Sequence, residues 1–151
     1  MTLPFARGDA KPPSDPSKFF NGDGLSLRLQ CFLVIRDADR RIACVRLKGS
    51  EGRWSLPGEN VRPNEDLHEA ARRVSQMWFG TDLQPRIADI LTFPEENDDK
   101  RWYVLFLYEA QAPRGGLPKL DDTDEVAFVP AGKAPGEFGM DHASVFARLK
   151  P

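Results

Sequence analysis

Apolar positions along the chain follow two different spacings. Five segments rich in β-branched and aromatic residues predict strands: residues 26–37, 42–47, 85–94, 101–110 and 125–130. Only the polar turn DADRR separates the first two, so we expect them to form a β-hairpin. Residues 66–79 instead place Leu67 and Val74 on one helical stripe, and Gly80 is a typical helix stop signal. A second, short amphipathic helix is expected at residues 141–150.

The order of these elements predicts one α+β domain. A hairpin, a helix, further strands and a final helix are typical of helices packed on a mixed β-sheet. A chain of 151 residues is long enough to bury a core without metal or disulfide crosslinks. Residues 1–23 are rich in Pro, Gly, Asp and Ser and have little periodicity. We therefore expect a flexible N-terminal arm, followed by a domain that spans residues 24–151.

The composition argues against several kinds of partner. A formal net charge of −2 is not the basic field of a nucleic-acid-binding protein. No apolar run approaches the roughly 20 residues of a membrane helix, and the N-terminus has no apolar segment of signal-peptide length. We therefore expect a cytoplasmic protein without membrane contact. Cys31 and Cys44 lie in strand-like segments without metal-type spacing, which predicts buried, reduced thiols.

One region of the sequence carries a family pattern. The segments RWSLPGENV…E…AARR…G resemble the box of the Nudix hydrolase family, and the likeness extends over roughly residues 25–149. Four residues match the box and its lead-in and are expected to keep a structural role: Gly58, Glu65, Arg73 and Gly80. The resemblance implies the family's α/β/α sandwich with a mixed sheet. It also implies hydrolysis of nucleoside-diphosphate derivatives with Mg²⁺ or Mn²⁺ and, as a default, a homodimer.

The box departs from the family pattern where the metal ligands belong. Its opening Gly is Glu59, and its three carboxylate positions hold Val74, Met77 and Trp78. Shifting the helix by one residue places no acid there either, because the positions then hold Arg73, Gln76 and Met77. The family's carboxylates hold Mg²⁺ or Mn²⁺, which require hard oxygen ligands. We therefore predict no metal site and no cofactor, with metal-dependent hydrolysis lost or very weak.

An alternative is a pyrophosphohydrolase, again dependent on Mg²⁺ or Mn²⁺, whose metal ligands have relocated. The catalytic carboxylates available to it are Glu59, Glu65, Glu69, Asp98 and Asp99. Each of them also has a simpler interpretation. Glu65, Glu69 and Arg73 lie four residues apart and are expected to form ion pairs along one helix face. Residues 95–100 are typical of a solvated turn between two strands.

The apolar residues at the acid positions allow two interpretations. Val74, Met77 and Trp78 are most simply part of the core. If the helix keeps its family orientation, they instead line the former metal cleft and contact a ligand. The main hypothesis is therefore a Nudix-fold protein with a degenerate box that binds a nucleotide-like small molecule or a protein partner. The remaining hypothesis is a purely structural module whose cleft is packed shut.

Overall fold

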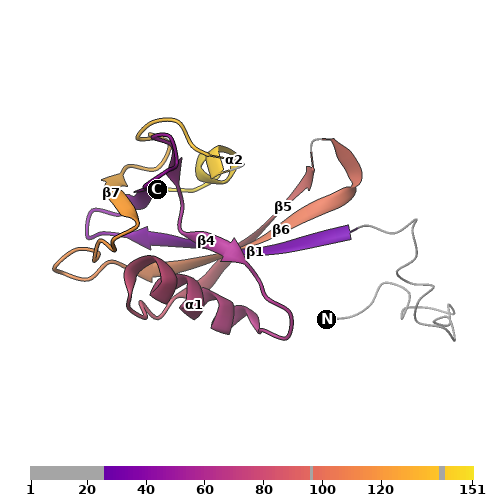
Figure 1. The fold of residues 1–151 in the computed structure, drawn as a ribbon, viewed down its shortest axis with the longest axis horizontal. Coiled ribbons are helices and arrows are strands. Elements are labelled where there is room, and N and C mark those ends of the chain that lie inside the picture. The colour runs from indigo at the N-terminus through magenta and orange to yellow at the C-terminus, as the bar shows by residue number, and fades with distance from the viewer. Residues whose placement is uncertain (1–25, 96, 140–141) are drawn as a thin grey trace, which may run out of the picture.

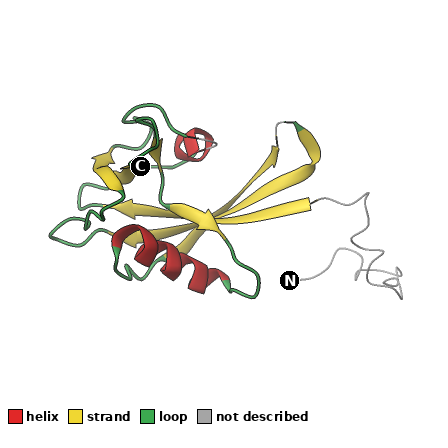
Figure 2. Cartoon of the chain, viewed as in Figure 1, coloured by secondary structure: helices red, strands yellow, loops and turns green. Residues whose placement is uncertain are grey.

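The computed structural model describes three ranges of the chain: residues 26–95, 97–139 and 142–151. The arm expected at residues 1–23 lies outside these ranges, as do the side chains of Asp98 and Asp99. The described elements follow in this order: β1 (Ser26–Arg36), β2 (Ile42–Leu47), β3 (Trp54–Ser55), β4 (Gly58–Asn60), α1 (Leu67–Phe79), β5 (Arg86–Glu95), β6 (Asp98–Gln111), β7 (Thr123–Val129) and α2 (His142–Ala147). Helix α1 lies on one side of the strands and α2 on the other (Figures 1 and 2).

Strand β1 organises the sheet. It runs parallel to β6 from the Ser26–Arg101 pair to the Arg36–Gln111 pair, and β5 lies antiparallel on the far side of β6. The other edge of β1 pairs with β4 in the antiparallel direction. β2 returns from β1 through a tight turn, pairs with it at Arg36 and Ile42, and then pairs with β3 and β7. The mixed sheet of an α+β sandwich is therefore confirmed.

Helix α1 has a defined start and a defined end. The Asp66 carboxylate accepts the Glu69 backbone N–H at 2.9 Å, and the Asp66 N–H donates to the Glu69 carboxylate at 3.3 Å. This capping box satisfies two backbone N–H groups at the start of the helix. Gly80 adopts the left-handed conformation, with φ 71°, and its N–H donates to the Gln76 carbonyl at 2.8 Å. The predicted helix and its glycine stop are confirmed.

The core consists of two clusters on opposite faces of the sheet. Successive side chains of a strand point to opposite faces, so Leu33 of β1 packs in the cluster with α1, and Val34 packs in the cluster with α2. Cys31 belongs to the first cluster and Cys44 to the second, and both are buried free thiols. Burial raises the pKa of each thiol to about 12, so both are neutral and unreactive near pH 7.

Three segments show the main differences from the sequence-based expectations. Residues 55–65, expected as loop, contain β4, because backbone pairing with β1 outweighs the Pro and Gly content. Residues 95–100, expected as a turn, lie largely within strands, because Glu95 and Asp98 still pair across the β5–β6 connection. Helix α2 ends at Ala147, where the following N–H groups bond three residues back instead of four. In the part of the chain that the structure describes, no helix is long and apolar enough to cross a membrane.

Candidate functional site

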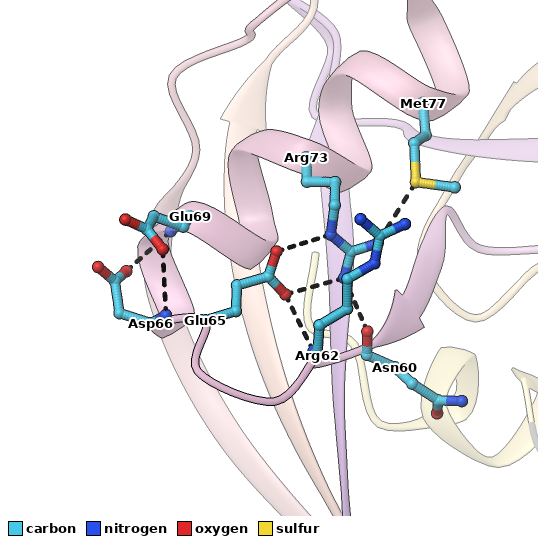
Figure 3. Close-up of polar contacts among 7 residues, drawn as sticks. All are labelled: Asn60, Arg62, Glu65, Asp66, Glu69, Arg73 and Met77. Carbon is cyan, nitrogen blue, oxygen red and sulfur yellow. Dashed lines mark hydrogen bonds and ion pairs between the residues drawn. The ribbon is translucent and has the colours of Figure 1, made fainter.

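One ion pair fixes the box loop to α1 (Figure 3). Arg73 Nε and Nη2 donate to the two carboxylate oxygens of Glu65 at 2.7 and 2.9 Å, which is a bidentate arrangement. Arg73 Nη2 also donates to the Asn60 carbonyl at 2.8 Å, and the Arg62 N–H donates to Glu65 Oε1 at 3.0 Å. Only 12% of the Glu65 side chain is exposed. The pair therefore connects β4, the following loop and α1.

The ion pair changes the acidity of Glu65. Hydrogen bonds from the Arg73 side chain, assisted by the Arg62 N–H, lower the pKa of Glu65 from 4.5 to about 2. A carboxyl group whose pKa is lower in the folded state stabilises the fold above its unfolded pKa and loses that contribution as the pH falls. The contribution of Glu65 is therefore complete near neutral pH and disappears between about pH 4.5 and pH 2.

Acid should weaken this ion pair measurably. Glu65→Gln keeps the shape of the side chain and removes its charge, so the wild type should have the larger free energy of unfolding at neutral pH. We expect the difference between the two proteins to shrink as the pH falls from about 4.5 towards 2. Urea unfolding of both proteins at several pH values measures this difference. A difference that stays constant across that range would show that the charge of Glu65 does not stabilise the fold.

Glu69 does not join the pair between Glu65 and Arg73. Its carboxylate accepts the Asp66 N–H in the capping box. The prediction that Glu65, Glu69 and Arg73 form ion pairs along one face is therefore correct for Glu65 and wrong for Glu69. The reason is local, because the first turn of a helix leaves N–H groups unsatisfied and a carboxylate three residues after the cap reaches them. Glu69 thus has a structural partner already.

Glu59 and Gly58 lie on β4, next to the ion pair. Glu65 raises the pKa of Arg73, and Glu59 adds to this effect through its charge. Gly58 lies against Phe32 of β1, where a Cβ atom would come within 2.9 Å of Phe32 Cγ and closer still to Cδ1 and Cε1. Gly58 is therefore the residue that lets β4 approach the Phe32 ring.

Gly58→Ala should destabilise the protein by about 1–3 kcal/mol, because the added methyl group forces the Phe32 ring from its position. The matched control is Gly115→Ala, where a Cβ atom would meet no atom within 4 Å. Thermal melts of both variants measure the change in stability. Equal melting temperatures for the two variants would show that Phe32 moves aside at no cost.

The three apolar residues at the acid positions have different surroundings. Val74 is fully buried in the cluster between α1 and the sheet, and Trp78 packs partly buried against the same cluster. Met77 is 45% exposed, with its sulfur 3.4 Å from Arg73 Nη1. Because Val74 is fully buried, a ligand does not reach it in this conformation. Val74 is therefore part of the core. Contact of Met77 or Trp78 with a ligand stays a prediction.

Ser75 is a buried polar side chain with a structural role that the pattern analysis missed. It is fully buried, its hydroxyl donates to the Thr81 carbonyl at 2.6 Å, and the hydroxyl oxygen accepts the Leu83 N–H at 2.9 Å. Two hydrogen bonds satisfy the buried hydroxyl and hold the segment after α1. The signal available in the sequence was a serine within the apolar stripe of the helix. It lies six residues before Thr81 and eight residues before Leu83.

The residues around the box do not fit a divalent cation. Mg²⁺ and Mn²⁺ require several hard oxygen ligands, whereas Val74, Met77 and Trp78 provide none. Glu65 is bound by Arg73, and Glu69 by the helix start. In the described ranges, which leave out the side chains of Asp98 and Asp99, no group of three or more His, Cys, Asp or Glu residues could hold a metal ion. The candidates Glu59, Glu65 and Glu69 therefore do not form such a group.

A pocket of about 420 Å³ lies on the opposite face of the sheet, beside α2. Strands β1, β5 and β6 and helix α2 contribute its main lining residues: Arg28, Gln30, Phe32, Phe93, Glu95, Tyr103, His142 and Ser144. The Arg28 guanidinium lies 5.8 Å from the centre of the Tyr103 ring, and the Phe32 ring meets His142 edge-on at 4.9 Å. Aromatic walls with a few polar groups are typical of a small-molecule site.

His142 links this pocket to the box region. Its Nδ1 accepts the Leu56 backbone N–H at 3.0 Å, so the neutral ring carries its proton on Nε2. Leu56 belongs to the lead-in of the box, and His142 begins α2. No sequence motif marks His142, Gln30 or Tyr103, because residues from distant segments meet only after the sheet forms. Val74, Met77 and Trp78 do not line this pocket.

The family model described as NUDIX domain matches residues 27–149. The chain therefore belongs to the Nudix family, and its fold is the Nudix α/β/α sandwich. Comparison with curated proteins finds no match.

Solved structures support the same fold. A MutT protein from Methanosarcina mazei Go1 aligns with a TM-score of 0.62 and 19% identity, over 81% of this chain and 91% of that one. A MutT NUDIX hydrolase from Burkholderia pseudomallei has a TM-score of 0.64 and 20% identity, over 83% and 99%. The E. coli dihydroneopterin triphosphate pyrophosphohydrolase has a TM-score of 0.60 and 12% identity, over 80% and 93%. Identities this low show the fold alone.

Proposed function

We propose that this member of the Nudix family is a non-hydrolytic protein that binds a nucleotide-like ligand in the pocket beside α2. The observation that carries the proposal is the state of the box. The three positions where the family has metal-binding acids hold Val74, Met77 and Trp78. Val74 is buried in the core, and the side chains of Met77 and Trp78 have no oxygen atom that could bind a metal ion. The nearby Glu65 carboxylate is already bound by Arg73. Hydrolysis of a diphosphate through a divalent cation would lack its ligands.

The chemistry of the pocket supports the binding half of the proposal. Phe93 and Tyr103 are cross-strand neighbours and offer aromatic surface to a flat heterocycle. Gln30 and Ser144 add hydrogen-bonding groups that discriminate among ring edges. The pocket is large enough for a purine or pterin ring, since small-molecule sites begin at about 300 Å³. The name of the E. coli relative refers to a triphosphate of such a flat ring.

The test of lost hydrolysis is turnover. With Mg²⁺ or Mn²⁺, and with nucleoside diphosphate derivatives, nucleoside triphosphates and dihydroneopterin triphosphate as substrates, we expect no release of product above a protein-free control. The same preparation is titrated with these compounds by calorimetry. Robust metal-dependent turnover would overturn the non-hydrolytic half of the proposal and return attention to Glu59, Asp98 and Asp99 as relocated ligands.

The test of the pocket is a pair of variants. Tyr103→Ala should weaken the binding of a nucleoside probe by about ten-fold, because stacking on an aromatic ring contributes roughly 1–3 kcal/mol per base. Trp78→Ala is the matched control, since Trp78 packs against the other face of the sheet and should lower stability while affinity stays unchanged. An affinity loss in Trp78→Ala at least as large as that in Tyr103→Ala would move the ligand to the α1 face.

A further inference from the structure

A carboxylate lines the pocket beside α2 together with its aromatic side chains. Glu95 is the last residue of β5, two positions after Phe93, and both residues line the pocket. Phe93 in turn pairs across the sheet with Tyr103 of β6, which also lines it. Among the described residues that line this pocket, Glu95 is the one that carries a carboxylate.

The fold leaves the hydrogen-bonding capacity of Glu95 unused. Its Oε2 atom is buried and accepts no hydrogen bond within the described part of the chain. Arg101 Nε lies 3.4 Å from Oε2, which is longer than the roughly 2.7–2.9 Å of a charge-assisted hydrogen bond. The Glu95 side chain as a whole is 31% exposed, so a ligand in the pocket can reach it. Because buried polar atoms in folded proteins nearly always have a partner, this carboxylate calls for a role outside the packing of the fold.

The aromatic side chains do not choose among flat rings. Every base has a π-face, so stacking on Tyr103 and Phe93 stabilises a purine of any kind. A polar group of the pocket has to make the choice. An ionised carboxylate only accepts hydrogen bonds, and both of its oxygens share its charge. Glu95 therefore favours a ring edge that presents N–H donors and disfavours one that presents a nitrogen lone pair.

The edges of the common purines differ in this respect. Guanine presents two neighbouring donors, the ring N1–H and the 2-amino group, and two parallel N–H groups suit a carboxylate best. Hypoxanthine keeps the N1–H and lacks the amino group. Adenine has one donor, its 6-amino group, next to the lone pair of N1, which a carboxylate repels. The expected order of affinity is therefore guanine, then hypoxanthine, then adenine.

We propose that Glu95 is the specificity-determining residue of the pocket beside α2 and that it selects rings with two adjacent N–H donors. The inference rests on the proposed function, because it assumes that a flat heterocycle occupies this pocket. It narrows the ligand from flat heterocycles in general to those with a guanine-like edge. Glu95 acts here by direct contact with the ring.

The test measures the affinities of guanosine, inosine and adenosine for the full chain by calorimetry in EDTA. We expect guanosine to bind at least about ten-fold more tightly than adenosine, with inosine between them, because hydrogen bonds to a charged group are the stronger ones. Glu95→Gln keeps the shape of the side chain, removes its charge and replaces one acceptor oxygen by a donor. This variant should lose most of the preference through weaker binding of guanosine, while the affinity for adenosine does not fall.

Two further variants separate contact with the ring from other effects of Glu95. Arg101→Gln removes the cation beside Glu95 and keeps the carboxylate, so the preference for guanosine should persist. Glu51→Gln removes a negative charge from a side chain that is 79% exposed and does not line the pocket, so it should leave all three affinities unchanged. Thermal melts of each variant check that it is folded.

The outcomes distinguish this inference from the proposed function. Equal affinities of the wild type for guanosine and adenosine would overturn the role of Glu95 and leave the binding pocket standing. A preference that survives Glu95→Gln, or that Arg101→Gln removes as fully, would show that Glu95 does not contact the ring. Failure of all three nucleosides to bind would overturn both the proposed function and this inference.

Discussion

Val74→Glu, which restores an acid to the box, is expected to destabilise the protein by about 3–5 kcal/mol, because it places an unpaired carboxylate in the core. Val74 is fully buried among apolar side chains of α1 and the sheet. Burial disfavours the charged form of the new carboxyl group, so its pKa should rise. The variant should therefore lose further stability as the pH rises above the unfolded value of about 4.3.

Met77→Glu is the matched control for this prediction. It restores the neighbouring acid position at a side chain that is 45% exposed and close to Arg73. A surface carboxylate beside a guanidinium should change stability by about 0.5 kcal/mol or less. Urea unfolding of both variants at neutral and mildly acidic pH makes the comparison. If Val74→Glu is as stable as Met77→Glu, the side chain at position 74 reaches solvent, and the former cleft is open.

Arg73→Ala is the second change with a large expected effect, about 2–4 kcal/mol. It removes both hydrogen bonds to Glu65 and the one to the Asn60 carbonyl. The Glu65 carboxylate is then left without its cation, although only 12% of the Glu65 side chain is exposed to solvent. Chemical denaturation at neutral pH measures the loss. The connection between the loop and α1 should loosen first, which hydrogen exchange of the helix N-terminus would detect.

Arg72→Ala provides the control from the adjacent residue. Arg72 is 63% exposed and pairs with Asp82 at 3.0 Å, so its removal should lower stability by about 1 kcal/mol or less. Adding Glu65→Gln to Arg73→Ala should recover part of the stability, because no uncompensated charge then remains. Equal losses for Arg72→Ala and Arg73→Ala, or a double variant with simply additive losses, would contradict a buried, coupled ion pair.

Local signals in the sequence predicted most of the fold. Helix α1 follows from its apolar spacing and from the residues at its two ends, Asp66 and Gly80, which act on neighbouring backbone. The five long strands follow from β-branched and aromatic content. β3 and β4 were not predicted, because two or three residues become strand only through partners elsewhere in the sheet. The parallel pairing of β1 with β6 likewise joins residues more than 70 positions apart.

The candidate site was less accessible to sequence analysis. The partnership of Glu65 with Arg73 could be anticipated from the box, whereas the role of Glu69 at the helix start depended on side-chain direction. The pocket beside α2 had no local signature. Its residues sit on alternate positions of strands and at the start of a short helix, such as Gln30, Tyr103 and His142. Each is unremarkable in its own segment, and only the strand order brings them together.

The alternation of side chains along β1 places α1 and the pocket on opposite faces of the sheet. Cys31 lies under α1, and its neighbour Phe32 forms a wall of the pocket. The apolar side chains of α1 therefore belong to one layer of the sandwich, and the pocket beside α2 belongs to the other. Gly58 beside Phe32 and Leu56 beside His142 are places where a change in the box would reach the pocket walls.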